Sequence, residues 1–226
     1  HSHLSTVNYL LSHGADVNVT DEDGETPLST AISNESIPIV EALLAAKASV
    51  DVIDTNNHTP LCYTAYQGNV PLTKILVDAR ANVDFRDTGG YTPLALSVLS
   101  GSVELVEILL KAKASPDIPT TEGYTPLMWA AKRGKIGIAR LLLDAKASMR
   151  ICDSECGSRY SALMCAVECG YERITELLLS AKAPVDEDTE EGMTPLMITA
   201  SKGGVRTISL LLNACLERAR HDVSDA

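Results

Sequence analysis

The feature that most constrains this chain is the triplet Thr-Pro-Leu, which returns at a nearly fixed interval. It begins at Thr26, Thr59, Thr92, Thr125 and Thr194. When Ser161-Ala162-Leu163 is counted as a degenerate copy, the steps between copies are 33, 33, 33, 36 and 33 residues. A period of this length indicates a stacked array of similar structural units.

Two further sets of residues recur at equivalent positions after the triplet, and each set is called a column below. A Gly column, which only Glu35 interrupts, consists of Gly68, Gly101, Gly134, Gly170 and Gly203. A column of Leu pairs consists of Leu43-Leu44, Leu109-Leu110, Leu142-Leu143, Leu178-Leu179 and Leu211-Leu212. We expect Leu109, Leu142 and Leu178 to be buried between neighbouring units.

Each unit is predicted to hold two short helices and a loop. Thr offers an N-cap oxygen and Pro fits the first helical turn, so the first helix begins at Thr-Pro and runs about eight residues to the Gly. The second helix of the fourth full unit is predicted at residues 136–143, with Ile138, Leu141 and Leu142 on its buried face. The polar segment that follows each second helix is predicted to be an extended loop, or finger.

These residues resemble the ankyrin repeat over residues 4–215. The resemblance implies an all-α ankyrin-repeat solenoid of helix-turn-helix units with extended loop or β-turn fingers. We expect a single domain over residues 1–226, with a finger three residues longer in the fifth full repeat. The expected repeats are a partial one at 1–22 and full ones at 23–55, 56–88, 89–121, 122–157, 158–190 and 191–226. Because the chain starts inside a repeat and without Met, we expect it to be a fragment.

Two columns depart from the family pattern. The His that usually follows Thr-Pro-Leu is replaced by Ser29, Cys62, Ala95, Met128, Met164 and Met197. Where the family usually has Gly after the second helix, Gly14 is followed by Lys47, Arg80, Lys113, Lys146 and Lys182. The helix dipole favours a cation at a helix C-terminus, which partly offsets the cost of a non-Gly residue in a left-handed cap. We therefore interpret this column as structural, in preference to a lysine ladder that binds an acidic partner.

Composition narrows the classes of partner and the compartment. Thirty acidic and nineteen basic residues give a net charge of -11, which repels phosphate backbones and argues against nucleic acid. No apolar run approaches the ~18 to 20 residues of a membrane span, so we expect no membrane insertion. Six cysteines in an aliphatic chain of 226 residues indicate reduced thiols and a cytoplasmic or nuclear protein. We expect a monomer.

The sequence gives no sign of an enzyme or a cofactor. It contains no nucleotide-binding loop, no Gly-x-Ser-x-Gly elbow and no His-Glu-x-x-His motif. The acidic run at residues 186–191 lacks the Gly and the spacing of a calcium loop, so we interpret it as a solvated finger that favours a basic partner.

Function is expected in the exposed columns. The resemblance implies a concave surface made by the finger residues before Thr-Pro and the outward positions of the first helix. These columns hold six of the nine aromatic residues in the chain, where a random draw would place roughly one. The candidate partner-binding residues are Tyr63, Tyr66, Tyr91, Leu96, Leu99, Tyr124, Trp129, Lys132, Arg133 and Tyr160. The competing interpretation is that Tyr91, Tyr124 and Tyr160 only brace neighbouring fingers.

We therefore predict a protein-protein interaction scaffold that binds a partner protein or peptide in its concave groove. Trp129 is expected near the energetic centre, and neither Trp129 nor Tyr124 is expected to matter for the stacking of repeats. The alternative is a regulatory or targeting module of a larger enzyme or channel.

A metal or redox function is the third class. Its candidates in the fifth full repeat are Cys152, Cys156, Cys165 and Cys169. Four thiolates suit zinc, but structural zinc sites mostly use tighter Cys-x2-Cys turns, and Cys169 should lie one helical turn further from the finger than Cys165. We favour inert thiols over a zinc site or a redox pair.

Overall fold

The computed structural model describes residues 3–55, 57–150 and 160–224. These residues form thirteen α-helices and no β-strand, which confirms the expected all-α helix-turn-helix architecture. Among these thirteen helices, none combines the length and the apolar character that crossing a membrane requires. The chain divides into two compact units, His1–Ala114 and Ser115–Ala226. The expectation of one domain over residues 1–226, with its repeat boundaries, stays a prediction.

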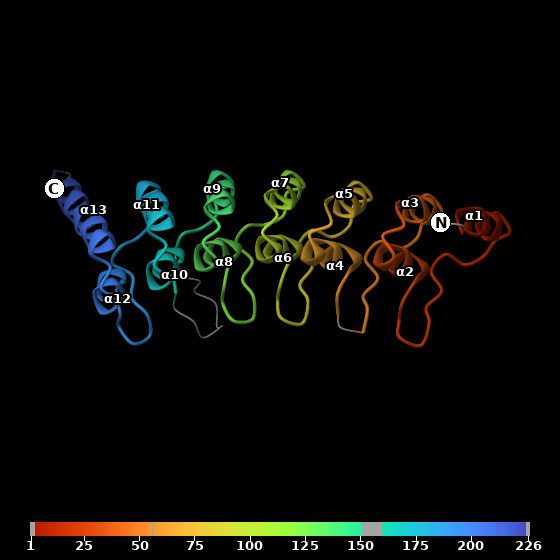
Figure 1. Cartoon of the computed structure of the whole chain (residues 1–226), viewed down its shortest axis with the longest axis horizontal. Helices are drawn as coiled ribbons and strands as arrows, with labels where there is room; N and C mark the ends of the chain where they lie inside the picture. The colour runs from red at the N-terminus through yellow and green to blue at the C-terminus, as the bar shows by residue number, and fades with distance from the viewer. Residues whose placement is uncertain (1–2, 56, 151–159, 225–226) are drawn as a thin grey trace. The chain divides into compact units, whose positions relative to one another are not determined.

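The first unit consists of one helix followed by three helix pairs. Its helices are α1 (Leu4–Ser12), α2 (Pro27–Ser33), α3 (Ile37–Ala45), α4 (Pro60–Gln67), α5 (Val70–Asp78), α6 (Pro93–Ser100) and α7 (Val103–Lys111). In this unit the first helices of the pairs, α2, α4 and α6, pack in one row (Figure 1). The second helices form another row, and the fingers extend away from it, on the side of the first helices (Figure 1).

The second unit has the same organisation in three helix pairs. Its helices are α8 (Pro126–Lys132), α9 (Ile136–Asp144), α10 (Ala162–Glu168), α11 (Glu172–Ser180), α12 (Pro195–Lys202) and α13 (Val205–Ser224). Helix α10 packs against both α8 and α12, and α11 packs against both α9 and α13. The lengthened finger expected before α10 falls at residues 151–159, outside the described residues.

The Thr-Pro signal places the start of each first helix as predicted. In five repeats the Thr hydroxyl accepts a hydrogen bond from the backbone N–H of the residue three positions later, at 3.1 to 3.4 Å. These residues are Thr26, Thr59, Thr92, Thr125 and Thr194. Ser161 does the same for Met164 at 3.3 Å, so the degenerate repeat keeps its cap although it lacks Pro. The residue that replaces the usual His contributes to the cap in two repeats, through the Ser29 hydroxyl and the Met128 sulfur.

The second helices supply the apolar core between repeats. Leu109, Leu142 and Leu178 are fully buried, as the sequence predicted. In α9 the buried face consists of Ile138, Ala139 and Leu142. Leu141, which the sequence placed on that face, is half-buried, because Ala139 lies closer to its centre.

Truncation of Leu142 tests the packing between repeats. Leu142→Ala should lower the free energy of unfolding by about 2 to 5 kcal/mol, because a fully buried Leu leaves a cavity. Leu216→Ala is the control, since the Leu216 side chain is exposed. Urea denaturation followed by circular dichroism measures both, and equal midpoints for Leu142→Ala and wild type would contradict the assigned packing.

The lysine column lies in left-handed caps. The φ angles of Lys47, Arg80, Lys113, Lys146 and Lys182 lie between +64° and +69°. At the end of α7, Lys113 N–H donates to the Leu110 carbonyl and Ala114 N–H donates to the Leu109 carbonyl, both at 3.0 Å. This pair of bonds is the Schellman motif, which usually has Gly at the left-handed residue.

Two Lys-to-Gly substitutions at the end of α7 should change the free energy of unfolding in opposite directions. Lys113→Gly should raise the free energy of unfolding by about 0.5 to 1 kcal/mol, because Gly adopts a positive φ without steric cost. Lys111→Gly should lower it by up to about 1 kcal/mol, because Lys111 is the last residue of the helix proper. Thermal melts compare the two variants, and a shift in the same direction would count against strain at the cap.

Helix α13 departs from this pattern. Cys215 occupies the position that Lys182 holds one repeat earlier, yet it stays helical, so α13 continues to Ser224 without a left-handed break. Helix α12, which packs against α13, exposes an apolar side chain. Met197 is 52 % exposed on α12, whereas the equivalent Met128 and Met164 are buried.

Candidate functional site

A repeating five-residue turn fixes the finger side chains that the sequence analysis singled out. In each described finger tip, the N–H of the first residue donates to the carbonyl of the fifth at 3.0 to 3.1 Å. The first residues are Asp21, Asp54, Asp87, Thr120 and Thr189. Their side-chain oxygens accept from the N–H of the fifth residue at 2.7 to 3.3 Å. The fifth residue is the one before Thr-Pro, so this column of Asp and Thr, which sequence reasoning missed, orients the candidate binding residues.

The first unit exposes two of its candidate binding residues to solvent, and the other three are buried or half-buried in packing contacts. Tyr63 and Tyr66, both on α4, are 36 % and 63 % exposed. Leu96 is buried on α6 in a cluster with Cys62 and Ala65, and Tyr91 packs against that cluster. Leu99 is half-buried.

A cleft lies between the first and second fingers of this unit, and it is called the finger cleft below. Its apolar walls are Ile32, Val52, Ile53 and Tyr63, its acidic side chains include Glu25 and Asp54, and its volume is about 70 Å³. Ile53 is 47 % exposed and directly precedes the polar tip of the second finger. That apolar residue next to a polar tip was the sequence signal for the cleft, and the sequence analysis did not use it.

His58 also lines the finger cleft, and its imidazole lies between two carboxylates. Its Nδ1 lies 3.6 Å from Asp54 Oδ2, and its Nε2 lies 3.7 Å from Asp87 Oδ2. The imidazole therefore spans the second and third fingers of the first unit.

The second unit gathers its candidates around α8. The rings of Tyr124 and Trp129 lie 5.0 Å apart between centroids, at an interplanar angle of 42°. Lys132 Nζ donates to the Tyr124 hydroxyl at 2.9 Å and lies 4.2 Å from the centroid of the Tyr124 ring. This hydrogen bond raises the pKa of Lys132, so the ammonium stays charged. The Arg133 guanidinium lies 5.7 Å from the Trp129 centroid, within range of a cation-π contact.

The expectation that Trp129 is an exposed residue is wrong, and its burial argues against the expectation that it does not matter for the stacking of repeats. Its side chain is only 7 % exposed. The Tyr124 ring and the Lys132 ammonium both lie beside the Trp129 ring. Tyr160, the last of the aromatic candidates, is half-buried, and burial raises the pKa of its hydroxyl.

Exposure separates the expected effects of two aromatic truncations. Trp129→Ala should lower the free energy of unfolding by about 3 to 5 kcal/mol, because it empties a buried aromatic site. Tyr66→Ala should change it by less than about 0.5 kcal/mol, because most of that side chain meets solvent. Chemical denaturation of both variants checks the contrast, which fails if Trp129→Ala unfolds at the wild-type midpoint.

The cysteine candidates are only partly described. Cys165 is buried in α10, and burial raises the pKa of its thiol to about 12, so its thiolate is scarce at neutral pH. Cys169 is exposed at the C-cap of the same helix. Cys152 and Cys156 lie outside the described residues, and the described ones contain no group of three or more His, Cys, Asp or Glu suited to a metal ion. The zinc and redox interpretations therefore stay untested.

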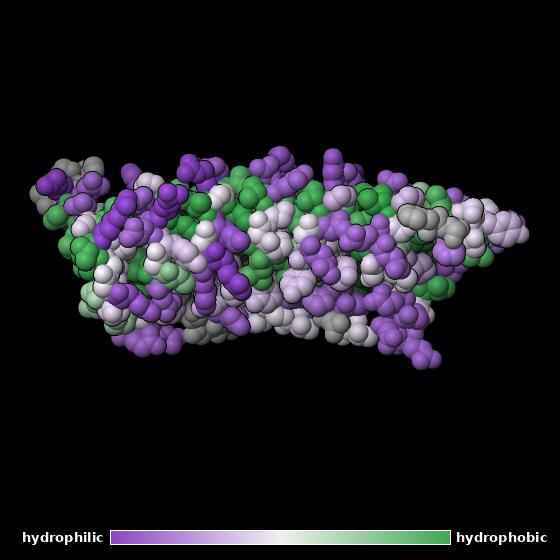
Figure 2. Space-filling model, viewed as in Figure 1, coloured by the Kyte–Doolittle hydropathy of each residue, from purple (hydrophilic) through white to green (hydrophobic). Residues whose placement is uncertain are grey.

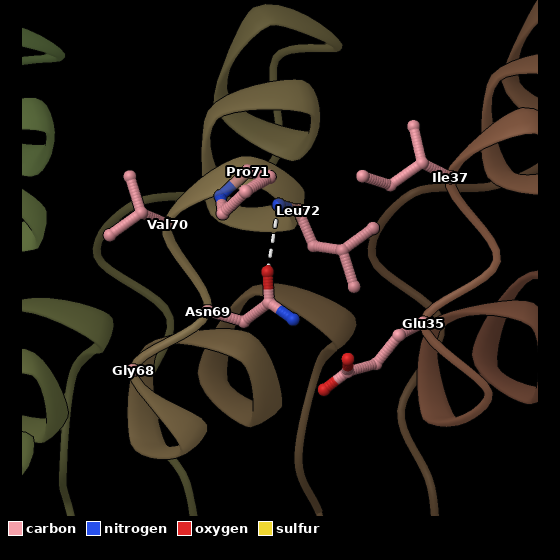
Figure 3. Close-up of a pocket in the computed structure, with 7 residues that line it drawn as sticks. All are labelled: Glu35, Ile37, Gly68, Asn69, Val70, Pro71 and Leu72. Carbon is pink, nitrogen blue, oxygen red and sulfur yellow. Dashed lines mark hydrogen bonds between the residues drawn. The ribbon is translucent and has the colours of Figure 1, made fainter.

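A second, larger groove lies at the turns between helices in the first unit (Figure 3). It measures about 310 Å³, and Glu35 faces Asn69 and the first turn of α5 across it. Glu35 interrupts the Gly column and keeps a positive φ of 52°. A carboxylate is favoured near a helix N-terminus, which partly offsets the strain of this backbone conformation. The groove lies at the turns between helices and is not assigned to binding.

Comparisons with known proteins place these features in context. A family model described as "Ankyrin repeats (3 copies)" matches residues 36–120, 64–153 and 112–188, and one described as "Ankyrin repeats (many copies)" matches residues 1–44. An ankyrin repeat domain from Acinetobacter baumannii AYE is 27 % identical with a TM-score of 0.77, over 83 % of this chain and 97 % of that one. The ankyrin repeat domain of Bcl-3, a member of the IkappaB protein family, is 24 % identical with a TM-score of 0.80, over 92 % and 91 %. No curated protein matches the chain by sequence.

Proposed function

Because the chain belongs to the ankyrin repeat family, we propose that it is an interaction module that holds a segment of a partner protein across its fingers and first helices. Ankyrin repeats generally mediate protein-protein interaction and are typically not enzymes. The observation that carries the proposal is the exposed apolar surface of the first unit, where Tyr63, Tyr66 and Ile53 meet solvent. Tyr is favoured at binding surfaces because it buries a large rigid area and keeps a polar hydroxyl.

The second unit supports the same proposal through different chemistry. Lys132 is held over Tyr124, and Arg133 is exposed beside Trp129, so both cations lie next to aromatic rings. A carboxylate of the partner would pair with Arg133 while an apolar neighbour contacts the Tyr124 ring. Trp129 supports this surface from beneath, because it is largely buried. Tyr160 adds a half-buried aromatic edge in the same unit.

The remaining candidates act indirectly in this proposal. Leu96 and Tyr91 fix the position of α6 relative to α4, since they pack with Cys62 and Ala65. The proposed partner is a protein or peptide, because a net charge of -11 opposes nucleic acid. The module is proposed to act as a monomer in the cytoplasm or the nucleus.

Two tyrosines of similar exposure test the proposal. Tyr66 on α4 is 63 % exposed, and Tyr9 on α1, in the row of second helices, is 62 % exposed. Proteins captured from a lysate by the wild type are identified, purified and titrated by calorimetry against each variant. Tyr66→Ala and Tyr63→Ala should each weaken binding about tenfold or more, or about 1.4 kcal/mol, with unchanged melting temperatures.

Tyr9→Ala is the matched control and should bind like the wild type. Equal losses for Tyr9→Ala and Tyr66→Ala would contradict the proposed surface, because they would show that loss of any exposed tyrosine has the same effect. Full retention of the partner by a Tyr63→Ala, Tyr66→Ala double variant would contradict it as well.

A further inference from the structure

The finger cleft combines apolar walls with a one-sided charge. Ile53 and Tyr63 are exposed at its mouth, while Ile32 is buried at its base. Its volume of about 70 Å³ leaves room for the end of one side chain. The cleft is thus suited to a single anchor residue of a partner and too small for a folded element.

The two fingers beside the cleft carry carboxylates and no cationic Lys or Arg. Residues 15–25 contain five Asp or Glu side chains and residues 48–58 contain two, while neither segment contains Lys or Arg. Figure 2 shows the first finger, which lies below α2 in Figure 1, covered by hydrophilic surface. The field at the cleft is therefore negative, and it attracts a cationic group of a partner.

These carboxylates are not equally available to a partner. Asp21 Oδ1 accepts two backbone N–H groups, and Asp54 accepts the N–H of His58 at 2.7 Å while its other oxygen faces the imidazole. Glu25 is held in place through its own backbone N–H, which donates to Asp21 at 2.9 Å, and its side chain lines the cleft. Glu25 is thus the carboxylate best placed to pair with an incoming cation.

We propose that the finger cleft binds an arginine side chain of an extended partner segment, with an adjacent apolar residue of that segment against Ile53. The planar guanidinium pairs with the Glu25 carboxylate through two donors and stacks on the Tyr63 ring, which a lysine ammonium matches less well. The methylene stem of the arginine covers Val52. This inference rests on the proposed function and names the chemistry of the partner at one site.

Within the second unit, the surface around α8 offers the opposite preference, in contrast to the acidic finger at residues 186–191. The cations over the Trp129 ring are Lys132 and Arg133, which repel a basic residue, although Glu168 offsets part of the charge of Lys132. A basic residue therefore finds a favourable site beside the first finger and an unfavourable one beside α8. Repulsion between like charges weakens the binding of wrong partners and contributes more to specificity than to the affinity for the correct partner.

A pair of peptides that differ only in one terminal group, a charged guanidinium or a neutral ureido group, tests the inference on the full chain. The probes are acetyl-Gly-Leu-Arg-Leu-Gly-amide and the same peptide with citrulline, the neutral isostere of arginine, titrated into the ¹⁵N-labelled protein. The arginine peptide should shift the amide signals of Glu25, Ile53 and Tyr63 and bind about three- to fivefold more tightly than the citrulline peptide. Added salt of about 0.5 M should remove that preference, because exposed charges are then screened.

Two glutamates of the first finger provide a matched pair of variants. Glu25→Gln should abolish the preference for arginine over citrulline, whereas Glu22→Gln, the same charge change outside the lining of the cleft, should preserve it within about twofold. Equal binding of both peptides to the wild type would overturn the inference. So would equal effects of the two variants, or shifts centred on α8.

The outcomes separate this inference from the proposed function. If the captured partner depends on Tyr66 but the arginine peptide shows no preference, the arginine site is wrong and the interaction module stands. If the peptide behaves as expected but no partner depends on Tyr63 or Tyr66, the cleft binds arginine and the proposed interaction surface is wrong.

Discussion

Every repeat of this chain relies on a neighbour to cover its apolar side. The first Leu of each pair in the Leu column is buried, with Leu109, Leu142 and Leu178 inaccessible to solvent. A single helix pair of about thirty residues cannot bury such a surface alone, so stability accumulates only as repeats stack. The caps, the left-handed turns and the fingers all attach to this stacked core, and they hold their positions because it does.

The scaffold was predictable from the sequence because local rules decide it. A Thr or Ser oxygen caps each first helix, and a left-handed residue follows each described second helix before α13, at the position that the columns implied. Side-chain exposure was less predictable, since it depends on neighbours from other segments. Trp129 is buried, and the finger residue Tyr124 and the helix residue Lys132 meet beside it. The finger cleft joins Glu25, Ile53 and Tyr63, which belong to different columns of the repeat, so no single column revealed it.

The fingers share one backbone geometry but present different side chains. The same turn, closed by Asp or Thr, recurs in both units and sets the backbone of the residue before Thr-Pro. That residue is Glu25 at one finger and Tyr124 at another, so one geometry presents a carboxylate in the first unit and an aromatic ring in the second. A common backbone thus supports different local preferences for charge, which is how a repetitive fold recognises a partner that is not itself repetitive.

The cationic left-handed residues also affect how freely the fingers move. Each one stands at the base of a finger, where the chain leaves the second helix, and a lysine there has far fewer backbone states than a glycine. A finger whose base is confined in this way swings less in the free chain. A partner that docks on such fingers then loses less conformational entropy on binding, so residues that never touch it help to preorganise the surface that does.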